Sequence, residues 1–386
     1  MQLKFNALLT YASAALFATT AVAAPVATSP NLIVFGNSLS DIGNAASLTN
    51  SQAYWGGRYS NSYVWNEYTA KLLGMTLINH AYGGATSSND LSPATAGSIS
   101  IPSFHDQVTT WLEENPSPSQ YNLDNDVIEI EIGGNDILHR ASGLLLGTVD
   151  LNDFASKLAA TISADVQRLV DAGYKNINLW NLPAVDKTPT ISGFGASALV
   201  KPVVAALNTA VRTAVEGVAA KNNASGVRVF DLNGLMEIAL QSDVLSALGI
   251  TDTADACLTQ DTNGTTYVCS NPDEYFFYDG VHPASRMHYL WGIVAAILTD
   301  DPNATIDTSE VLQLVSTFAI KQSNREDNII ADGITPSQSS AIPPAEDTDT
   351  DTETNTDDAE QSATYTTPIY TTPLYPTVAP PINKCK

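Results

Sequence analysis

The amino-acid sequence predicts an α/β fold, a three-layer α/β/α sandwich with a five-stranded parallel sheet. Between residues 31 and 320, short apolar runs rich in β-branched residues alternate with longer segments of helical periodicity. The chain is 44% hydrophobic and 15% charged, which provides enough apolar content for a large packed core. Strands that alternate with helices are joined by crossovers, and crossovers produce a parallel sheet covered on both faces.

Five short apolar runs that end near turn residues are predicted to be strands. They cover residues 31–35, 76–82, 127–132, 176–180 and 227–230. The first stops at Gly36 and the third at Gly133. Because functional residues in such sheets gather at the carboxyl ends of the strands, we expect the site there.

Four longer segments are predicted to be helices. A helical face runs over residues 63–73, and apolar residues recur at every fourth position over 154–170, before Gly173 as the C-cap. An Ala- and Val-rich helix covers about 198–220, and the last helix, 284–298, has its entry marked by a proline. These helices would form the outer layers.

Composition divides the 386 residues into three parts. Residues 1–23 have a positively charged start, an apolar stretch and a final Ala-Val-Ala, the pattern of a cleaved secretory signal peptide. A membrane anchor is the alternative, but the stretch is short for a bilayer span and is interrupted by Ser and Thr. Residues 24–330 form the globular domain, and 331–386, rich in Ser, Thr, Pro, Asp and Glu, are expected to be a disordered acidic tail. We therefore expect an extracellular protein, with cell-wall association as a hypothesis for the tail.

The charge balance limits the partners. The chain has 41 acidic and 17 basic residues and a net charge of −24, a field that repels phosphate backbones, so no nucleic-acid partner is expected. No segment after the signal peptide has eighteen uninterrupted apolar residues, so no integral membrane segment is expected either. We expect a monomer.

The cysteines and glycosylation motifs fit a secreted chain. Cys257 and Cys269 lie twelve positions apart in a polar stretch and are expected to form a disulfide, which leaves Cys385 unpaired or bonded to another chain. Cysteines and histidines show neither C-x-x-C nor H-x-x-x-H spacing, so no metal site is expected. The motifs that begin at Asn223, Asn263 and Asn303 fit the rule for N-glycosylation acceptors in a eukaryotic source.

Three candidate residues follow the first three strands. Ser38 stands in Gly-Asn-Ser-Leu-Ser-Asp, where the amides of a following helix could point at a nucleophile; alternatively Ser38 or Ser40 is simply a helix N-cap. Gly84 leaves a backbone N–H open to an oxyanion, and Asn135 can donate a side-chain hydrogen bond to developing negative charge. Each of these two could equally belong to an ordinary turn.

The fourth candidate group lies just before the last helix. Asp279 and His282 are three residues apart, so the carboxylate can hold one imidazole nitrogen while the other faces Ser38. A serine hydroxyl is a weak nucleophile at neutral pH and needs such a proton acceptor. The alternative is an Asp N-cap beside a surface His.

Together these four blocks resemble the GDSL or SGNH family of esterases and lipases, over residues from about 32 to 298. The resemblance implies a flavodoxin-like SGNH hydrolase fold for residues 24–330 and no cofactor. It implies that Ser38 is the nucleophile, that Asp279 and His282 complete the triad, and that the Ser38 amide, Gly84 and Asn135 form the oxyanion hole. The segment from Trp55 to Asn61 resembles the secreted hemolysin- or lecithinase-like subgroup, and Trp55 and Tyr59 are candidates for the wall of a substrate groove.

The chain departs from the family pattern at one position of the first block, where Asn37 stands in place of the usual Asp. Asparagine is nearly isosteric with aspartate and keeps an acceptor oxygen, so the turn can survive while one negative charge is lost. We expect activity to be retained.

The sequence therefore favours a secreted serine esterase or lipase that hydrolyses carboxylic esters through an acyl-enzyme, with a small-molecule, lipid or polysaccharide ester as substrate. Two alternatives stay open. One is a carbohydrate acetylesterase of the same fold, and the other is a catalytically silent binding or wall protein.

Overall fold

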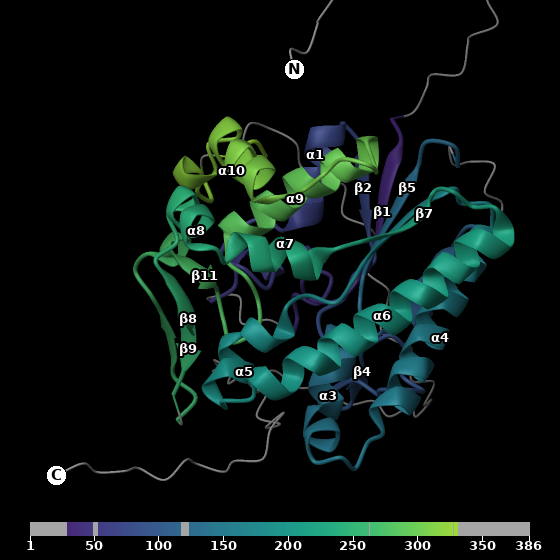
Figure 1. The fold of residues 1–386 in the computed structure, drawn as a ribbon, viewed down its shortest axis with the longest axis horizontal. Coiled ribbons are helices and arrows are strands. Elements are labelled where there is room, and N and C mark those ends of the chain that lie inside the picture. Colours follow the sequence, from purple (N-terminus) through teal and green to yellow (C-terminus); the bar gives the residue numbers. More distant parts are fainter. Residues whose placement is uncertain (1–28, 49–52, 117–122, 262, 327, 331–386) are drawn as a thin grey trace, which may run out of the picture.

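The computed structural model describes residues 29–48, 53–116, 123–261, 263–326 and 328–330. The predicted signal peptide, the acidic tail and Cys385 lie outside these described residues. A central sheet is covered by helices on both faces, with α4 packed along α6 on one face and α1 packed against α9 on the other (Figure 1).

The main sheet has five parallel strands in the order β2-β1-β5-β6-β7, so the predicted fold class is confirmed. The strands are β1 (Asn31–Gly36), β2 (Thr76–Asn79), β5 (Val127–Glu131), β6 (Asn176–Trp180) and β7 (Val227–Phe230). The register pairs Gly36 at the end of β1 with Glu131 at the end of β5, so the loops that follow these strands start side by side.

The second strand is shorter than predicted. It ends at Asn79 instead of Tyr82, because the Asn79 Oδ1 accepts the N–H of Ala81 at 3.0 Å and bends the chain. The backbone N–H groups of His80 and Tyr82 still donate to β1, so the chain continues beside that strand toward Gly84.

The helices that cover the sheet include all four predicted ones. They are α1 (Trp65–Leu73), α2 (Phe104–Glu114), α3 (Gly134–Leu145), α4 (Leu151–Asp171), α5 (Pro189–Gly193), α6 (Ser197–Asn222), α7 (Leu232–Ala239), α8 (Ser242–Leu248), α9 (Ser285–Asp300) and α10 (Thr308–Thr317). Gly173 follows α4 with φ of 99°, a left-handed conformation that suits glycine at a helix end.

Short strands lie outside the main sheet and were not predicted. They are β3 (Thr95–Ala96), β4 (Ile99–Ser100), β8 (Asp252–Ala256), β9 (Leu258–Gln260), β10 (Thr266–Val268) and β11 (Tyr275–Phe277). Strand β11 pairs with β8 and delivers the chain directly to Asp279.

Helix α6 is the one helix in the described part of the chain that is long and apolar enough to cross a bilayer. Its apolar residues include Val204, Leu207 and Val211, which are buried in the same core cluster as the inner face of α4. Packing against α4 therefore accounts for its composition.

The two faces of β5 differ in chemistry. Ile128 and Ile130 pack in the core shared with α4 and α6. Glu129 and Glu131 point to the opposite face, where the Glu129 carboxylate accepts a bond from Thr299 of α9 at 3.1 Å. Both glutamates are fully buried.

Candidate active site

Ser38 lies in a tight turn directly after β1. The Asn37 side chain accepts the N–H of Leu39 at 2.9 Å, and the N–H of Ser40 donates to the Asn37 carbonyl at 3.0 Å. The expectation of a helix after Ser38 is wrong: the described residues that follow it form turns, because the Asn37 side chain and carbonyl close the loop locally. Ser38 is consequently no helix N-cap.

Glycine at position 36 is a requirement of this turn. A Cβ on Gly36 would lie 2.5 Å from the backbone oxygen of Glu131, far inside normal contact distance. The absence of a side chain lets the end of β1 approach β5 and places Ser38 over the edge of the sheet.

The structure brings His282 and Asp279 to Ser38 from the other end of the domain. The His282 Nε2 lies 2.7 Å from the Ser38 Oγ, and the His282 Nδ1 lies 2.7 Å from the Asp279 Oδ2. The second carboxylate oxygen, Oδ1, accepts the N–H groups of Val281 and His282, both at 2.8 Å. These contacts form a continuous chain of hydrogen bonds from carboxylate to hydroxyl, so neither side chain is the surface residue of the alternative interpretation.

Asp279 is a charged group in a buried position. Burial alone would raise its pKa, but the charge of His282 and hydrogen bonds from His282, Tyr54 and the Val281 amide outweigh it, so the pKa of Asp279 lies below its usual value. The carboxylate can therefore orient the imidazole and stabilise its protonated form.

Candidate donors for negative charge come from the Ser38 turn, from the loop after β2 and from the start of α3. Gly84 has φ of 85°, and among the described residues the N–H groups of Ser38 and Gly84 have no hydrogen-bond partner. The Asn135 side chain, in the first turn of α3, donates to the carbonyl of Ala85 at 2.8 Å. That contact uses one of its two amide hydrogens and ties Asn135 to the neighbour of Gly84.

An apolar pocket opens next to Ser38. Ser38, Asn135 and His282 form its polar edge, whereas Gly84 is not part of its lining. Its apolar lining includes Leu138, Val185, Leu232, Met236, Met287 and Trp291. A pocket with this lining suits a hydrocarbon chain attached to a carbonyl at Ser38.

Two tyrosines that complete the surroundings of the Asp279–His282 pair come from the segment before α1. The Tyr54 hydroxyl donates to the Asp279 Oδ2 at 2.5 Å, and the Tyr59 ring lies 5.1 Å from the His282 ring. Neither of the two groove candidates, Tyr59 and Trp55, lines the pocket beside Ser38, and Trp55 packs against Tyr63. Sequence reasoning missed Tyr54, since no local pattern connects it to a carboxylate 225 positions away.

A second carboxyl group lies beneath the Ser38 turn. Glu131 is fully buried, and neither of its oxygens has a hydrogen-bond partner of normal geometry in the described part of the chain. Burial raises the pKa of Glu131 from 4.5 to about 8, and only the Asn37 side chain opposes this shift.

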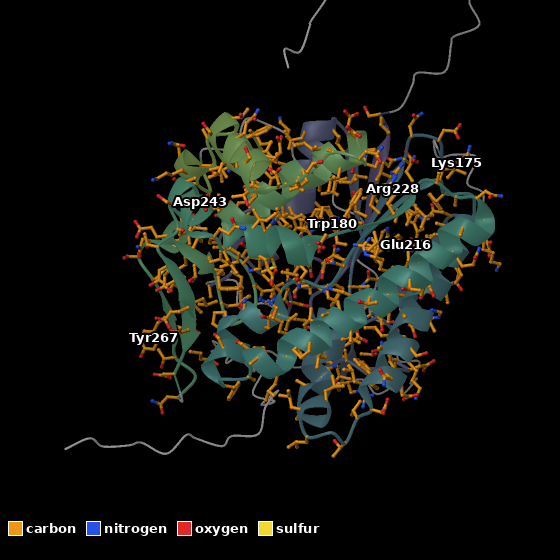
Figure 2. The ribbon with its side chains drawn as sticks, in the orientation of Figure 1. Lys175, Trp180, Glu216, Arg228, Asp243 and Tyr267 are labelled. Atoms are coloured by element: carbon orange, nitrogen blue, oxygen red, sulfur yellow. A yellow bond between two sulfur atoms is a disulfide. The ribbon has the colours of Figure 1, made fainter. Side chains whose placement is uncertain are left out.

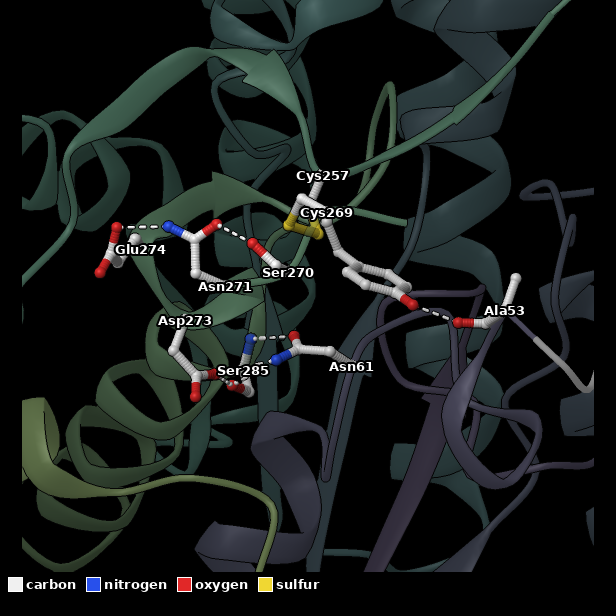
Figure 3. Close-up of a disulfide and its surroundings, with 10 residues drawn as sticks. Ala53, Asn61, Cys257, Cys269, Ser270, Asn271, Asp273, Glu274 and Ser285 are labelled. Carbon is white, nitrogen blue, oxygen red and sulfur yellow. Dashed lines mark hydrogen bonds between the residues drawn. A yellow bond between two sulfur atoms is a disulfide. The ribbon is translucent and has the colours of Figure 1, made fainter. Parts of the chain in front are cut away.

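Other predicted sites lie away from this cluster. The structure pairs Cys257 with Cys269 in a disulfide beside the β9–β10 hairpin (Figure 3). The three glycosylation candidates are exposed: Asn223, Asn263 and Asn303. Within the residues that the structure describes, no group of three or more His, Cys, Asp or Glu side chains is arranged to hold a metal ion.

The fold is that of a three-layer α/β/α sandwich, and the side chains of Ser38, His282 and Asp279 meet at the carboxyl edge of its sheet. The model of the GDSL-like Lipase/Acylhydrolase family matches residues 32–292. The chain belongs to this family.

Three curated relatives illustrate the range of similar proteins. Thermolabile hemolysin of Vibrio parahaemolyticus is 25% identical over 67% of this chain and 60% of its own length. Phosphatidylcholine-sterol acyltransferase of Aeromonas hydrophila is 31% identical over 41% of this chain and 46% of its own. An acetylesterase of Thermothelomyces thermophilus is 28% identical over 29% of this chain and 36% of its own. The matches thus span less than two thirds of each relative.

Proposed function

We propose that the protein is a secreted serine esterase that hydrolyses carboxylic esters, with Ser38, His282 and Asp279 as its catalytic triad. The observation that carries the proposal is the unbroken chain of hydrogen bonds from Asp279 through His282 to Ser38. Family membership supports the same reaction class.

In the first half of the reaction, the Ser38 Oγ attacks the ester carbonyl carbon while its proton passes to the His282 Nε2. The tetrahedral intermediate collapses, the His282 proton goes to the leaving alkoxide, and an acyl-enzyme and free alcohol result. Water then attacks the acyl carbon and gives a proton to His282. The bond between the acyl carbon and the Ser38 Oγ breaks, His282 returns its proton to this oxygen, and the acid is released. Asp279 stays ionised and keeps the imidazole oriented throughout.

The tetrahedral oxyanion is stabilised by the N–H groups of Ser38 and Gly84 and by the remaining amide hydrogen of Asn135. Loss of one such donor typically costs about 10²–10³ in turnover. We therefore expect Asn135→Ala to reduce kcat by roughly that factor without unfolding the protein. An Asn135→Ala enzyme of full activity would remove Asn135 from the oxyanion hole.

The preferred substrates are proposed to be lipid-like esters with an acyl chain longer than acetyl, because the pocket beside Ser38 is lined mainly by apolar side chains. A carbohydrate acetylesterase is the second candidate, supported by the similarity to the Thermothelomyces acetylesterase. A comparison of p-nitrophenyl acetate with longer acyl esters up to palmitate separates the two. An optimum at acetate, combined with deacetylation of acetylated sugars, would favour the second candidate.

Covalent labelling tests the reaction class itself. A fluorophosphonate probe is expected to modify wild-type protein at Ser38 and to leave Ser38→Ala unmodified. Wild-type protein that is neither labelled nor active on any ester would support a silent binding or wall protein instead.

Secretion is part of the proposal. It is supported by the N-terminal pattern of charged, apolar and small residues and by a disulfide that forms in oxidising compartments. Mass spectrometry of the mature N-terminus and of peptides that contain Asn223, Asn263 and Asn303 tests cleavage and glycosylation.

A further inference from the structure

We propose that Tyr54 is a positioning residue for the acid–base pair: its hydroxyl holds the Asp279 carboxylate and reduces the negative charge that His282 experiences. The inference rests on the proposed function, because it assigns Tyr54 to the same triad. Tyr54 does not contact the reacting atoms and acts only through Asp279.

The hydrogen bonds of Asp279 show why Tyr54 matters. The Asp279 Oδ2 accepts both the Tyr54 hydroxyl at 2.5 Å and the His282 Nδ1 at 2.7 Å, while Oδ1 accepts two backbone amides. Tyr54 and His282 therefore share one oxygen. The hydrogen bond from Tyr54 partly neutralises the negative charge on the Asp279 Oδ2. This oxygen therefore stabilises the protonated form of His282 less strongly than it would without Tyr54.

The segment that carries Tyr54 is attached to the Asp279–His282 loop on both sides of the contact. The carbonyl of Ala53 accepts the hydroxyl of Tyr278, and the Asn61 Oδ1 accepts the N–H of Ser285 at 2.9 Å (Figure 3). The Ser60 hydroxyl adds a bond to the Pro283 carbonyl at 3.3 Å. Tyr54 is thus fixed relative to Asp279 by hydrogen bonds that do not involve its own side chain.

Aromatic rings pack beside the pair. The Tyr54 ring lies 5.4 Å from the Tyr59 ring, which in turn lies 5.1 Å from the His282 ring. Burial, followed by the charge of Asp279, raises the pKa of Tyr54 well above 10, so the hydroxyl remains a donor at any pH at which the enzyme works.

The Tyr59 ring, on the same segment as Tyr54, packs on His282. Two further titratable groups among the described residues lie near the pair, Tyr278 beside Asp279 and His288 on α9, and both are uncharged near neutral pH. Burial and the charge of His282 lower the pKa of His288 to about 3, and burial raises the pKa of Tyr278 above its usual value. A change in the titration of His282 on removal of the Tyr54 hydroxyl therefore reports on Asp279.

The test is Tyr54→Phe, which removes the hydroxyl and keeps the ring that packs on Tyr59. We expect kcat to fall roughly tenfold, the scale of one hydrogen bond to a charged group, because the Asp279 carboxylate that orients His282 is then held less firmly, with little change in KM. The acid limb of the kcat/KM profile is expected to move to higher pH by about half a unit, because His282 then holds its proton more strongly.

The matched control is Tyr267→Phe. The Tyr267 hydroxyl also donates to a carboxylate, that of Asp261 at 3.1 Å, but this tyrosine is exposed on the β10 strand, far from the centre of the fold (Figure 2). The Tyr267→Phe variant should match the wild type in kcat and in both limbs of the pH profile of kcat/KM.

A second measurement keeps the two proposals separate. The NMR titration of the His282 imidazole in the full-length protein needs no turnover, and its midpoint is expected to rise in Tyr54→Phe and to stay unchanged in Tyr267→Phe. An unmoved midpoint, or a lower kcat with an unmoved acid limb, would overturn the role of Tyr54 while the esterase assignment stands. Conversely, a wild type without ester hydrolysis or fluorophosphonate labelling overturns the proposed function, and the imidazole titration still decides whether Tyr54 tunes the pair.

Discussion

Two buried carboxyl groups near Ser38 behave in opposite ways. Asp279 is 8% exposed and Glu131 is 0% exposed, yet the pKa of Asp279 lies below its usual value and that of Glu131 is raised to about 8. Asp279 has four hydrogen-bond donors, one of which is the His282 imidazole, whereas Glu131 has no partner of normal geometry in the described residues. Partners, more than depth, decide whether a buried carboxyl carries charge.

The lack of partners around Glu131 within the described residues also gives a physical reason for asparagine, and not the usual aspartate, at position 37. Asn37 lies in the turn above Glu131, and its side chain is the group that favours the charged form of that carboxyl. An aspartate at 37 would place a second carboxyl next to one that has no cation to balance it. Asparagine preserves the bond to the Leu39 N–H and adds no charge.

The largest effect is expected on turnover and comes from Asp279, the carboxyl with the lowered pKa. Asp279→Asn removes the charge that orients His282 and replaces one acceptor oxygen with a donor amide. In a Ser-His-Asp triad this change costs about 10⁴-fold in turnover. Steady-state kinetics on a p-nitrophenyl ester measures it, with a melting curve to show that the fold persists. A loss below about tenfold would mean that Asp279 is a structural carboxylate and not the triad acid.

The next largest effect is expected on the stability of the protein and comes from Glu131. The folded-state pKa of Glu131 is about 8 against 4.5 for an ordinary glutamate, so the stability that the protonated carboxyl contributes is present below about pH 4.5 and is lost as the pH rises through about 8. The loss is on the order of 5 kcal/mol in the free energy of unfolding. Glu131→Gln cannot ionise, and its stability relative to wild type is therefore expected to increase between pH 5 and 9.

Chemical denaturation at several pH values measures this slope, and the slope is informative even if glutamine changes stability by a constant amount. The control is Glu216→Gln, a position on α6 where the carboxylate is exposed and pairs with Arg212 at 3.4 Å (Figure 2). This control should show the pH dependence of the wild type. Parallel curves for wild type and Glu131→Gln would show that Glu131 is already ionised or hydrated in the folded state.

The smallest effect is expected at the Ser38 turn. Asn37→Asp should retain turnover within about tenfold near neutral pH, because the turn bond to Leu39 survives and one proton can be shared by the two carboxyls. As the pH is raised, the activity of Asn37→Asp should decline at a lower pH than that of the wild type. The double variant Asn37→Asp, Glu131→Gln should regain the alkaline pH dependence of the wild type. A rise of several orders of magnitude in turnover for Asn37→Asp would show that asparagine is a defect and not an adaptation to Glu131.

Local patterns were sufficient to predict the sheet and much of its cover. The five strands of the main sheet and the helices α1, α4, α6 and α9 follow from apolar periodicity and from turn residues such as Gly36 and Gly173. Helices α2, α3, α5, α7, α8 and α10 were not predicted, although α7 and α10 begin after Asp231 and Asp307, whose side chains cap them. None of these helices is longer than 12 residues, so each offers few turns over which an apolar pattern can repeat.

The sequence by itself therefore determined the succession of strands and helices along the chain and the residue types that follow each strand, since turn chemistry and periodicity act over a few neighbouring residues. The alternation of Ile and Glu in β5 is by itself typical of a strand with one solvent-exposed face. Only the tertiary structure decided that α1 and α9 cover that face and bury Glu131, and that the Tyr54 segment reaches Asp279. Burial and long-range hydrogen bonds depend on contacts between distant segments, such as Tyr54 and Asp279, which lie 225 positions apart, and these contacts set which carboxyl is charged.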